Sequence, residues 1–187
     1  MPGINFLLFI TGTSSGFLWR GSTVDDSFIL SERRRFGEIT AERDAIVISF
    51  SDYEIMCSEG RTFPERIVYV MVNSDNQPEY SDDFHFVSSF EELCGDLLRL
   101  RKNPSVTVTS SSDSEFLEMF LPYAHTVCIT TVNAFSAVQI PCPALERDQW
   151  VLIEELPTGT QSPGDVYTTT YSVYERTTPQ QALPLAC

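Results

Sequence analysis

The segment TVTSSSDSEFLEMFLP, residues 107–122, runs from strand through a polar turn into a helix. The β-branched residues around Val108 are typical of an extended strand. Phe116, Leu117 and Phe120 then recur at the spacing of one helix face. Parallel sheets are built from such strand-turn-helix units, so this stretch predicts an α/β fold.

The turn of this segment lies where many α/β proteins bind a phosphate. Such turns usually carry glycine, which lets the ligand approach the backbone, whereas this one reads Ser-Ser-Ser-Asp-Ser. Asp113 would obstruct a pyrophosphate and repel its charge. Ser112 and Glu115 have the spacing of a capping box, which would satisfy the helix N–H groups internally. We therefore expect residues 110–115 to be a self-capped helix start rather than a phosphate site.

The rest of the chain continues the alternation of strands and helices. Strands are expected at 4–10, 45–50, 67–72, 106–109 and 126–132, with a shorter one at 83–89, and helices at 28–40, 89–102 and 113–124. Residues 150–156 and 166–176 alternate as in a long antiparallel hairpin. The pattern predicts one three-layer α/β domain over 1–176, with a mainly parallel sheet and an antiparallel edge, followed by a loose tail at 177–187.

The composition is that of a globular protein with a strong acidic excess. The 187 residues are 42% hydrophobic, and the formal net charge is −14. A basic nucleic-acid-binding face is therefore excluded. An acidic face for a basic partner is an alternative to the simpler interpretation, which is solubility.

The cysteines and histidines point to an intracellular protein without a metal centre. The five cysteines are scattered, and there are only two histidines, which fits reduced thiols better than disulfides or a zinc site. The apolar segment 4–10 is too short to span a bilayer and is interpreted as a buried strand rather than a signal peptide. No particular compartment is indicated.

The order of elements and several short segments resemble dihydrofolate reductase and the related reductase domain of riboflavin biosynthesis. The resemblance extends over residues 4–176 and rests on LSERRRFGEIT (30–40), GRTFPERIVYVMVN (60–73), FVSSFEEL (86–93), FLPYAHTVCITTV (120–132) and VYTTTYSVYER (166–176). It implies the dihydrofolate-reductase-like fold. It also implies an NADPH-dependent reductase of a pteridine-type or pyrimidine-type substrate.

Four residues match the substrate side of this family. Glu32 and Phe36 lie four positions apart, so they share a helix face with Phe28. By resemblance, Glu32 is the catalytic acid, Phe36 a substrate contact, Arg66 the anchor of a substrate carboxylate, and Thr130 the catalytic residue that orients the acid. The alternatives are a carboxylate favoured by the helix dipole, a solvated arginine and a threonine that fills a strand.

The cofactor side departs from the family pattern at both of its loops. The family has Gly-Arg-x-Thr after a buried strand, where this chain has Ser49, Phe50, Ser51 and Asp52. The family has a Gly-Gly pair where this chain has Ser112 and Asp113. Ser49, Ser51, Ser112 and Asp113 thus mark a degenerate cofactor site. Together the two departures argue against ordinary NADPH binding.

Three functions remain open at this point. The chain is an active NADPH reductase, a reductase-fold protein without activity that serves as a binding module or as a subunit of a larger assembly, or a reductase that uses another cofactor, such as a flavin. The second is favoured slightly. The segment GTSSGFLWRGSTVDDS, residues 12–27, contains Trp19 and is either a mobile lid or a simple loop.

Overall fold

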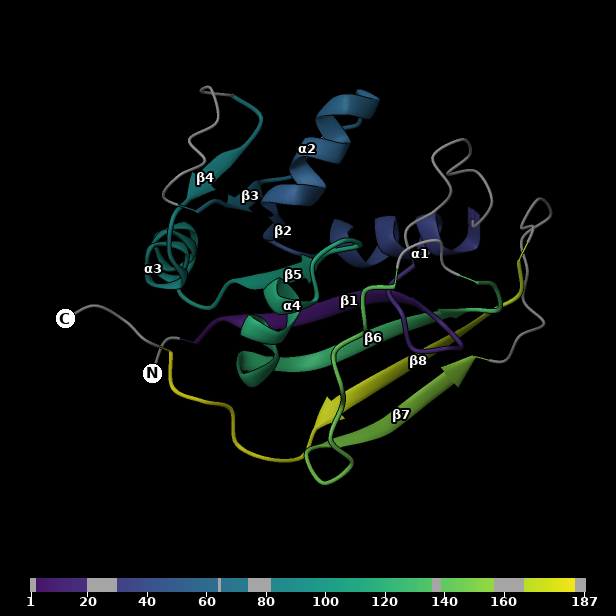
Figure 1. The fold of residues 1–187 in the computed structure, drawn as a ribbon. Helices are drawn as coiled ribbons and strands as arrows, with labels where there is room; N and C mark the ends of the chain where they lie inside the picture. The colour runs from purple at the N-terminus through teal and green to yellow at the C-terminus, as the bar shows by residue number, and fades with distance from the viewer. Residues whose placement is uncertain are drawn as a thin grey trace.

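A computed structural model describes residues 3–19, 30–63, 65–73, 82–135, 139–156 and 167–183. These residues form an eight-stranded sheet in the order β4-β3-β2-β5-β1-β6-β8-β7 (Figure 1). The strands are β1 (Asn5–Thr13), β2 (Ala45–Ser49), β3 (Val68–Met71), β4 (His85–Val87), β5 (Ser105–Thr109), β6 (Ala124–Val132), β7 (Trp150–Leu156) and β8 (Thr169–Arg176).

The sheet is parallel from β4 to β6 and antiparallel at its C-terminal edge. β1 lies between β5 and β6 and pairs with both in parallel, while β8 runs antiparallel to β6 and to β7. This confirms the expected α/β architecture and its closing antiparallel pair. β8 begins at Thr169, three residues later than expected, and the connection at 157–166 lies outside the described residues.

The helices are α1 (Leu30–Ala41), α2 (Phe50–Glu59), α3 (Phe90–Leu100) and α4 (Ser114–Phe120), followed by the 3₁₀ turn η2 (Leu121–Tyr123). α2 was not predicted, because its sequence has little apolar periodicity. It is defined by its ends instead. Ser49 caps the first turn by accepting from the backbone N–H of Asp52, and Gly60 ends the helix in the left-handed conformation, with φ 63°.

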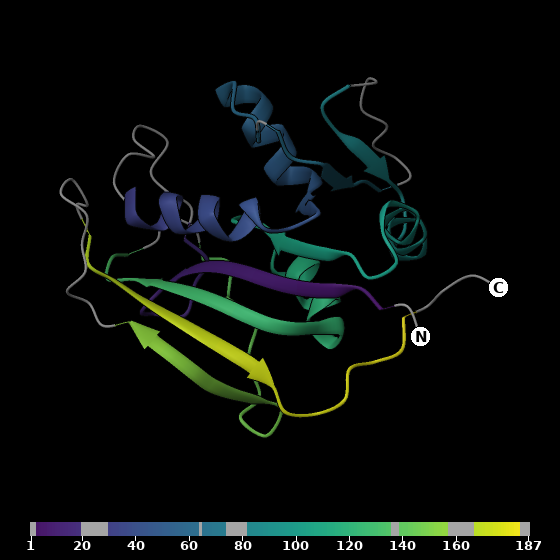
Figure 2. The same ribbon diagram turned by 180° about the vertical axis from the view of Figure 1, so that it is seen from behind.

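The helices cover the sheet on both faces. Phe6 and Leu8 of β1 belong to the core that α3 and α4 complete, whereas Phe9 packs on the other face with the side chains of α1 (Figures 1 and 2). Burial on both faces explains why β1 is an almost uninterrupted apolar run. None of the helices in the described residues is long and apolar enough to cross a membrane.

The first part of the C-terminal segment is attached to the domain. The backbone N–H of Thr177 donates to the carbonyl of Gln149 at 2.8 Å, and that of Gln181 donates to the carbonyl of Pro122 at 3.2 Å. Leu183 packs against the core beside α3 and α4. These contacts differ from the loose tail expected at 177–187, of which residues 184–187 lie outside the described part.

Candidate ligand site at the carboxyl edge of the sheet

The carboxyl ends of β1, β2 and β5 meet at one edge of the sheet. α1 and α2, which follow β1 and β2, lie on one face, whereas α4, which follows β5, lies on the other. In open α/β sheets, ligands bind at the edge where consecutive connections change face. The predicted site residues Glu32, Ser49 and Asp113 all come from segments that begin at this edge.

Glu32 lies in the first turn of α1 and is hydrogen-bonded to the end of β1. The hydroxyl of Thr11 donates to the Oε1 atom of Glu32. Thr11 pairs in register with Thr130 on the neighbouring strand β6. The hydroxyl of Thr130 is fully buried and has no hydrogen-bond partner among the described residues. The hydroxyl contact expected from Thr130 therefore comes from Thr11 in this structure.

Phe36 follows Glu32 by one helical turn, which places both on the same side of α1, as expected. Its ring packs edge-to-face on Phe9, with ring centroids 5.1 Å apart. On its other side it contacts Phe63, at 5.7 Å. Phe36 therefore joins two parts of the core below α1. The substrate contact expected from the resemblance would have to use the part of the ring that Phe9 and Phe63 do not cover. Phe28 lies outside the described residues.

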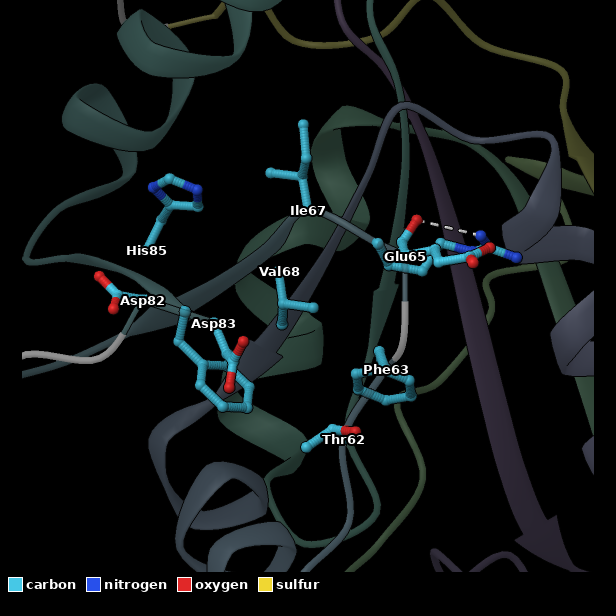
Figure 3. Close-up of a pocket in the computed structure, with 10 residues that line it drawn as sticks. Thr62, Phe63, Glu65, Ile67, Val68, Asp82, Asp83 and His85 are labelled. Atoms are coloured by element: carbon cyan, nitrogen blue, oxygen red, sulfur yellow. Dashed lines mark hydrogen bonds between the residues drawn. The ribbon is translucent and has the colours of Figure 1, made fainter.

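Arg66 lies at the amino end of β3 and lines a pocket of about 390 Å³. One guanidinium nitrogen donates to the carbonyl of Glu65 at 3.2 Å, and the Nε atom is buried without a hydrogen-bond partner among the described residues (Figure 3). Three carboxylates, those of Glu65, Asp82 and Asp83, line the same pocket. An anionic ligand held by Arg66 would thus meet more negative than positive charge.

The two expected cofactor loops are joined by their own side chains. We call this group the serine cluster; its members are Ser49, Ser51, Asp52, Ser110, Ser111 and Ser112. The hydroxyls of Ser49 and Ser110 lie 3.2 Å apart, and that of Ser112 donates to the hydroxyl of Ser51 at 3.2 Å. The β2–α2 junction and the β5–α4 junction are therefore in direct contact.

Asp52 is the centre of the serine cluster. Its Oδ1 atom accepts from the backbone N–H of Ser111 at 3.1 Å and from the hydroxyl of the same residue at 2.7 Å. Its Oδ2 atom accepts from the hydroxyls of Ser49 and Ser110. An anion at a strand-to-helix junction is held by just such N–H and hydroxyl donors. In this structure, the carboxylate of Asp52 accepts from these donors instead.

The helix start at 110–115 is self-capped, as expected, but by a different residue. Asp113 is the N-cap of α4, and its carboxylate accepts from the backbone N–H of Phe116 at 2.9 Å. The expected capping box with Ser112 at its start is thus wrong by one position. Asp113 takes this role because its backbone is extended, at φ −140° and ψ 100°, which brings its carboxylate over the first turn.

The segment after β1 is tied back onto its neighbours. The backbone N–H of Trp19 donates to the carbonyl of Thr11 at 2.8 Å, and that of Leu18 donates to the carbonyl of Ile140 at 2.7 Å. A Cβ atom on Gly12 would lie 2.6 Å from the sulfur of Cys142, so a larger residue here would require Cys142 to move. The contacts favour a simple loop over a lid for 13–19; the rest of the segment, residues 20–27, lies outside the described part.

Sequence reasoning missed the roles of Thr11 and Asp52. Thr11 interrupts the apolar run of β1 with a hydroxyl close to the strand end, which is a signal for a polar contact. Asp52 stands three residues after Ser49, which is the spacing of a helix cap. Its partners Ser110 and Ser111 are 58 and 59 residues away in the chain, and no local pattern could have named them.

The comparisons with known proteins support the fold alone. No family model matches the sequence, and no curated protein matches it. Among solved structures, the chain is similar to dihydrofolate reductase from Enterococcus faecalis, complexed with NADP(H) and RAB-propyl. The TM-score is 0.73 at 18% identity, over 93% of this chain and 97% of the other. The chain therefore has the dihydrofolate reductase fold.

Proposed function

We propose that this protein keeps the dihydrofolate reductase fold without using NADPH, and that it acts as a binding module or as a subunit of a larger assembly. The observation that carries the proposal is the position of Asp52. Its carboxylate accepts from three hydroxyls and one backbone N–H at the two junctions where the resemblance would place the cofactor phosphates. These donors already have an acceptor within the chain, so a cofactor phosphate would have to compete with it.

Electrostatics strengthens this proposal. Two unit charges 4 Å apart in partly screened surroundings repel by about 4 kcal/mol, which corresponds to about a thousandfold in affinity. Asp52 and Asp113 place a carboxylate at each of the two junctions. Neither 49–52 nor 110–114 contains a lysine or an arginine to offset that charge. A pyrophosphate would have to displace Asp52 from its donors and then remain beside it.

An active reductase is the second candidate, and the acid side of the edge favours it. The pair Thr11–Glu32 lies beside the buried, unpaired hydroxyl of Thr130. A heterocycle with a polar edge would satisfy that hydroxyl and meet the carboxylate. In this candidate, Glu32 supplies a proton, Thr130 holds the substrate and Arg66 anchors its anionic end.

Calorimetric titration with NADPH separates the two candidates. We expect no detectable heat of binding up to millimolar NADPH, and no bound flavin absorbance in the purified protein. The informative variant is Asp52→Thr, which removes the carboxylate and restores the threonine of the family pattern; we expect NADPH binding to become measurable. The matched control is Glu54→Gln, which removes an exposed acid from the same helix and should leave binding undetectable.

A dissociation constant in the micromolar range for the unaltered protein would contradict the proposal. It would mean that Asp52 leaves its donors when nucleotide arrives, and the second candidate would then take precedence.

A further inference from the structure

The outer strand of the sheet, β7, exposes three apolar side chains in succession. Val151, Leu152 and Ile153 are 46%, 44% and 51% exposed, and they are three consecutive residues of one strand. Most of the chain's other exposed large apolar residues are single positions on other elements, such as Leu100 and Met119. Scattered apolar residues are normal on a protein surface, whereas a run of them along an edge strand is not.

β7 also offers backbone groups for pairing. Within the described part of the chain it pairs with β8 alone, and it forms one end of the sheet (Figure 1). An edge strand carries N–H and C=O groups that point away from the sheet and can pair with another chain. The opposite edge, β4, is only three residues long and begins with an exposed histidine. Very short edge strands resist pairing, so the two ends of the sheet differ.

The charges along β7 select the kind of strand that can pair there. Glu154 and Glu155 follow the apolar residues on β7, and Glu175 lies opposite Val151 on β8; all three are exposed. The nearest basic side chain on β8, Arg176, stacks on Trp150 at 4.3 Å and donates to the carbonyls of Leu121 and Ala124. It is therefore directed into the domain and does not neutralise the glutamates.

A second copy of this chain fits the surface poorly. Two copies paired through β7 would bring six of these carboxylates into one interface, on chains that each carry a net charge of −14. Like charges gathered in an interface oppose association and exclude wrong partners.

We propose that β7 is a docking site for an extended segment of another protein that has apolar residues at one end and basic residues at the other. The segment adds a ninth strand beside β7, so its backbone pairs with the outer edge. Its apolar end lies beside Val151, Leu152 and Ile153, and its lysine or arginine side chains meet Glu154 and Glu155 on both faces of the sheet. The stacking of Arg176 on Trp150 holds the start of β7 in place before the segment binds.

This inference does not depend on whether the protein binds nucleotide, because β7 and the serine cluster belong to different parts of the sheet. Its test uses a synthetic peptide, acetyl-Val-Ile-Val-Lys-Lys-Lys-Lys-amide, with a fluorescent label, and measures fluorescence anisotropy against the full chain. Three companion peptides are needed: one with every second amide N-methylated, one with glutamate in place of lysine, and one of the same composition in which apolar and basic residues alternate.

We expect the peptide with separate apolar and basic ends to bind and to slow hydrogen exchange at the amides of β7. N-methylation should weaken binding at least tenfold, because it removes the backbone donors while keeping charge and apolar surface. The variant Glu154→Gln/Glu155→Gln should weaken binding about tenfold at low salt, and less at high salt. The control pair Glu54→Gln/Glu115→Gln removes two exposed acids from helices and should leave the affinity within twofold.

Three results would overturn the inference. If the N-methylated or the reordered peptide binds as tightly as the original peptide, the binding is only attraction between opposite charges. Equal binding of the glutamate peptide would show unspecific apolar adhesion. Dimerisation of the chain in sedimentation, abolished by Ile153→Lys, would assign the edge to a second copy. Circular dichroism and thermal unfolding of each variant establish that it is folded before its affinity is compared.

Discussion

The two sides of the carboxyl edge differ in how far the chain satisfies its own polar groups. On the side of α1, Thr11 bonds Glu32, while the buried hydroxyl of Thr130 has no partner among the described residues. On the side of the serine cluster, Asp52 accepts four hydrogen bonds and ties two junctions together. A polar group without a partner is a place where a ligand can gain binding energy, whereas a satisfied group is not.

The difference separates a group of polar side chains that satisfy one another from a hydroxyl that has no partner among the described residues. The carboxylate of Asp52 occupies the donors that an anionic ligand at these junctions would need. The predictions that follow test the two sides separately, beginning with the largest expected effect.

Removing the carboxylate of Asp52 should cost the most stability. The variant Asp52→Ala leaves the N–H of Ser111 and three hydroxyls without their common acceptor. Hydrogen bonds to a charged group contribute about 1.5–3 kcal/mol each and are not additive, so we expect a loss of about 3 kcal/mol. Urea unfolding followed by circular dichroism measures this loss.

The matched control for this variant is Asp113→Ala, which removes a helix N-cap and nothing more. Such a loss costs about 1 kcal/mol. If both variants lose the same stability, Asp52 is an ordinary cap, and the contrast between the two sides of the edge disappears.

Removing the hydroxyl of Thr130 should have a smaller effect of the opposite sign. Thr130→Val keeps the β-branched shape and replaces a buried hydroxyl that has no partner in this structure. We expect a gain of about 1 kcal/mol, because an unpaired buried polar group carries its full desolvation cost. Thermal unfolding should show the gain as a rise of about 2–4 °C in Tm.

Thr107 provides the control, since its hydroxyl on β5 is also buried and unpaired among the described residues. Thr107→Val should gain as much stability as Thr130→Val if neither hydroxyl makes a hydrogen bond. A loss of stability in Thr130→Val alone would mean that the hydroxyl bonds Glu32 after all, as the resemblance first implied.

Features of the fold that depend on residues close together in the sequence could be predicted, whereas those that join distant residues could not. β1 and β6 were predictable because their apolar runs are local and long, and the cap of α3 was predictable because Ser89 and Glu92 are three residues apart. α2 was missed because its helical signal lies in the caps Ser49 and Gly60 rather than in its apolar pattern.

The site was harder to predict than the fold. Glu32 and Phe36 were placed on one face correctly, since helical spacing determines this. The bridge from Asp52 to Ser110 and Ser111 joins residues almost sixty positions apart, and it exists only because β2 and β5 are neighbours in the sheet. By resemblance, the two loop sequences indicated that acids stand where the family has its phosphate loops; only the folded chain shows that Asp52 accepts from the donors of both.

The smallest expected effect concerns the amino ends of the strands, where Asp44, just before β2, also joins two segments. Its carboxylate accepts from the backbone N–H of Ser105 at 2.8 Å and from Arg101 at 3.2 Å. These contacts, chiefly the bond from the N–H of Ser105, hold the pKa of Asp44 below its usual value of 3.8. A lowered pKa means that the folded state favours the charged form, so the contribution of Asp44 to stability is present above about pH 4 and is lost as the pH falls through the folded pKa.

The variant Asp44→Asn should therefore be slightly less stable than the unaltered protein at pH 7 and equally stable near pH 2, with urea unfolding measured at both values. Arg101→Gln should reduce the same difference only in part, because Arg101 is the lesser cause of the shift. A difference between Asp44→Asn and the unaltered protein that persists at pH 2 would show that the asparagine disturbs the strand itself. Asp44 would then not be comparable with Asp52, whose effect we attribute to the carboxylate and its donors.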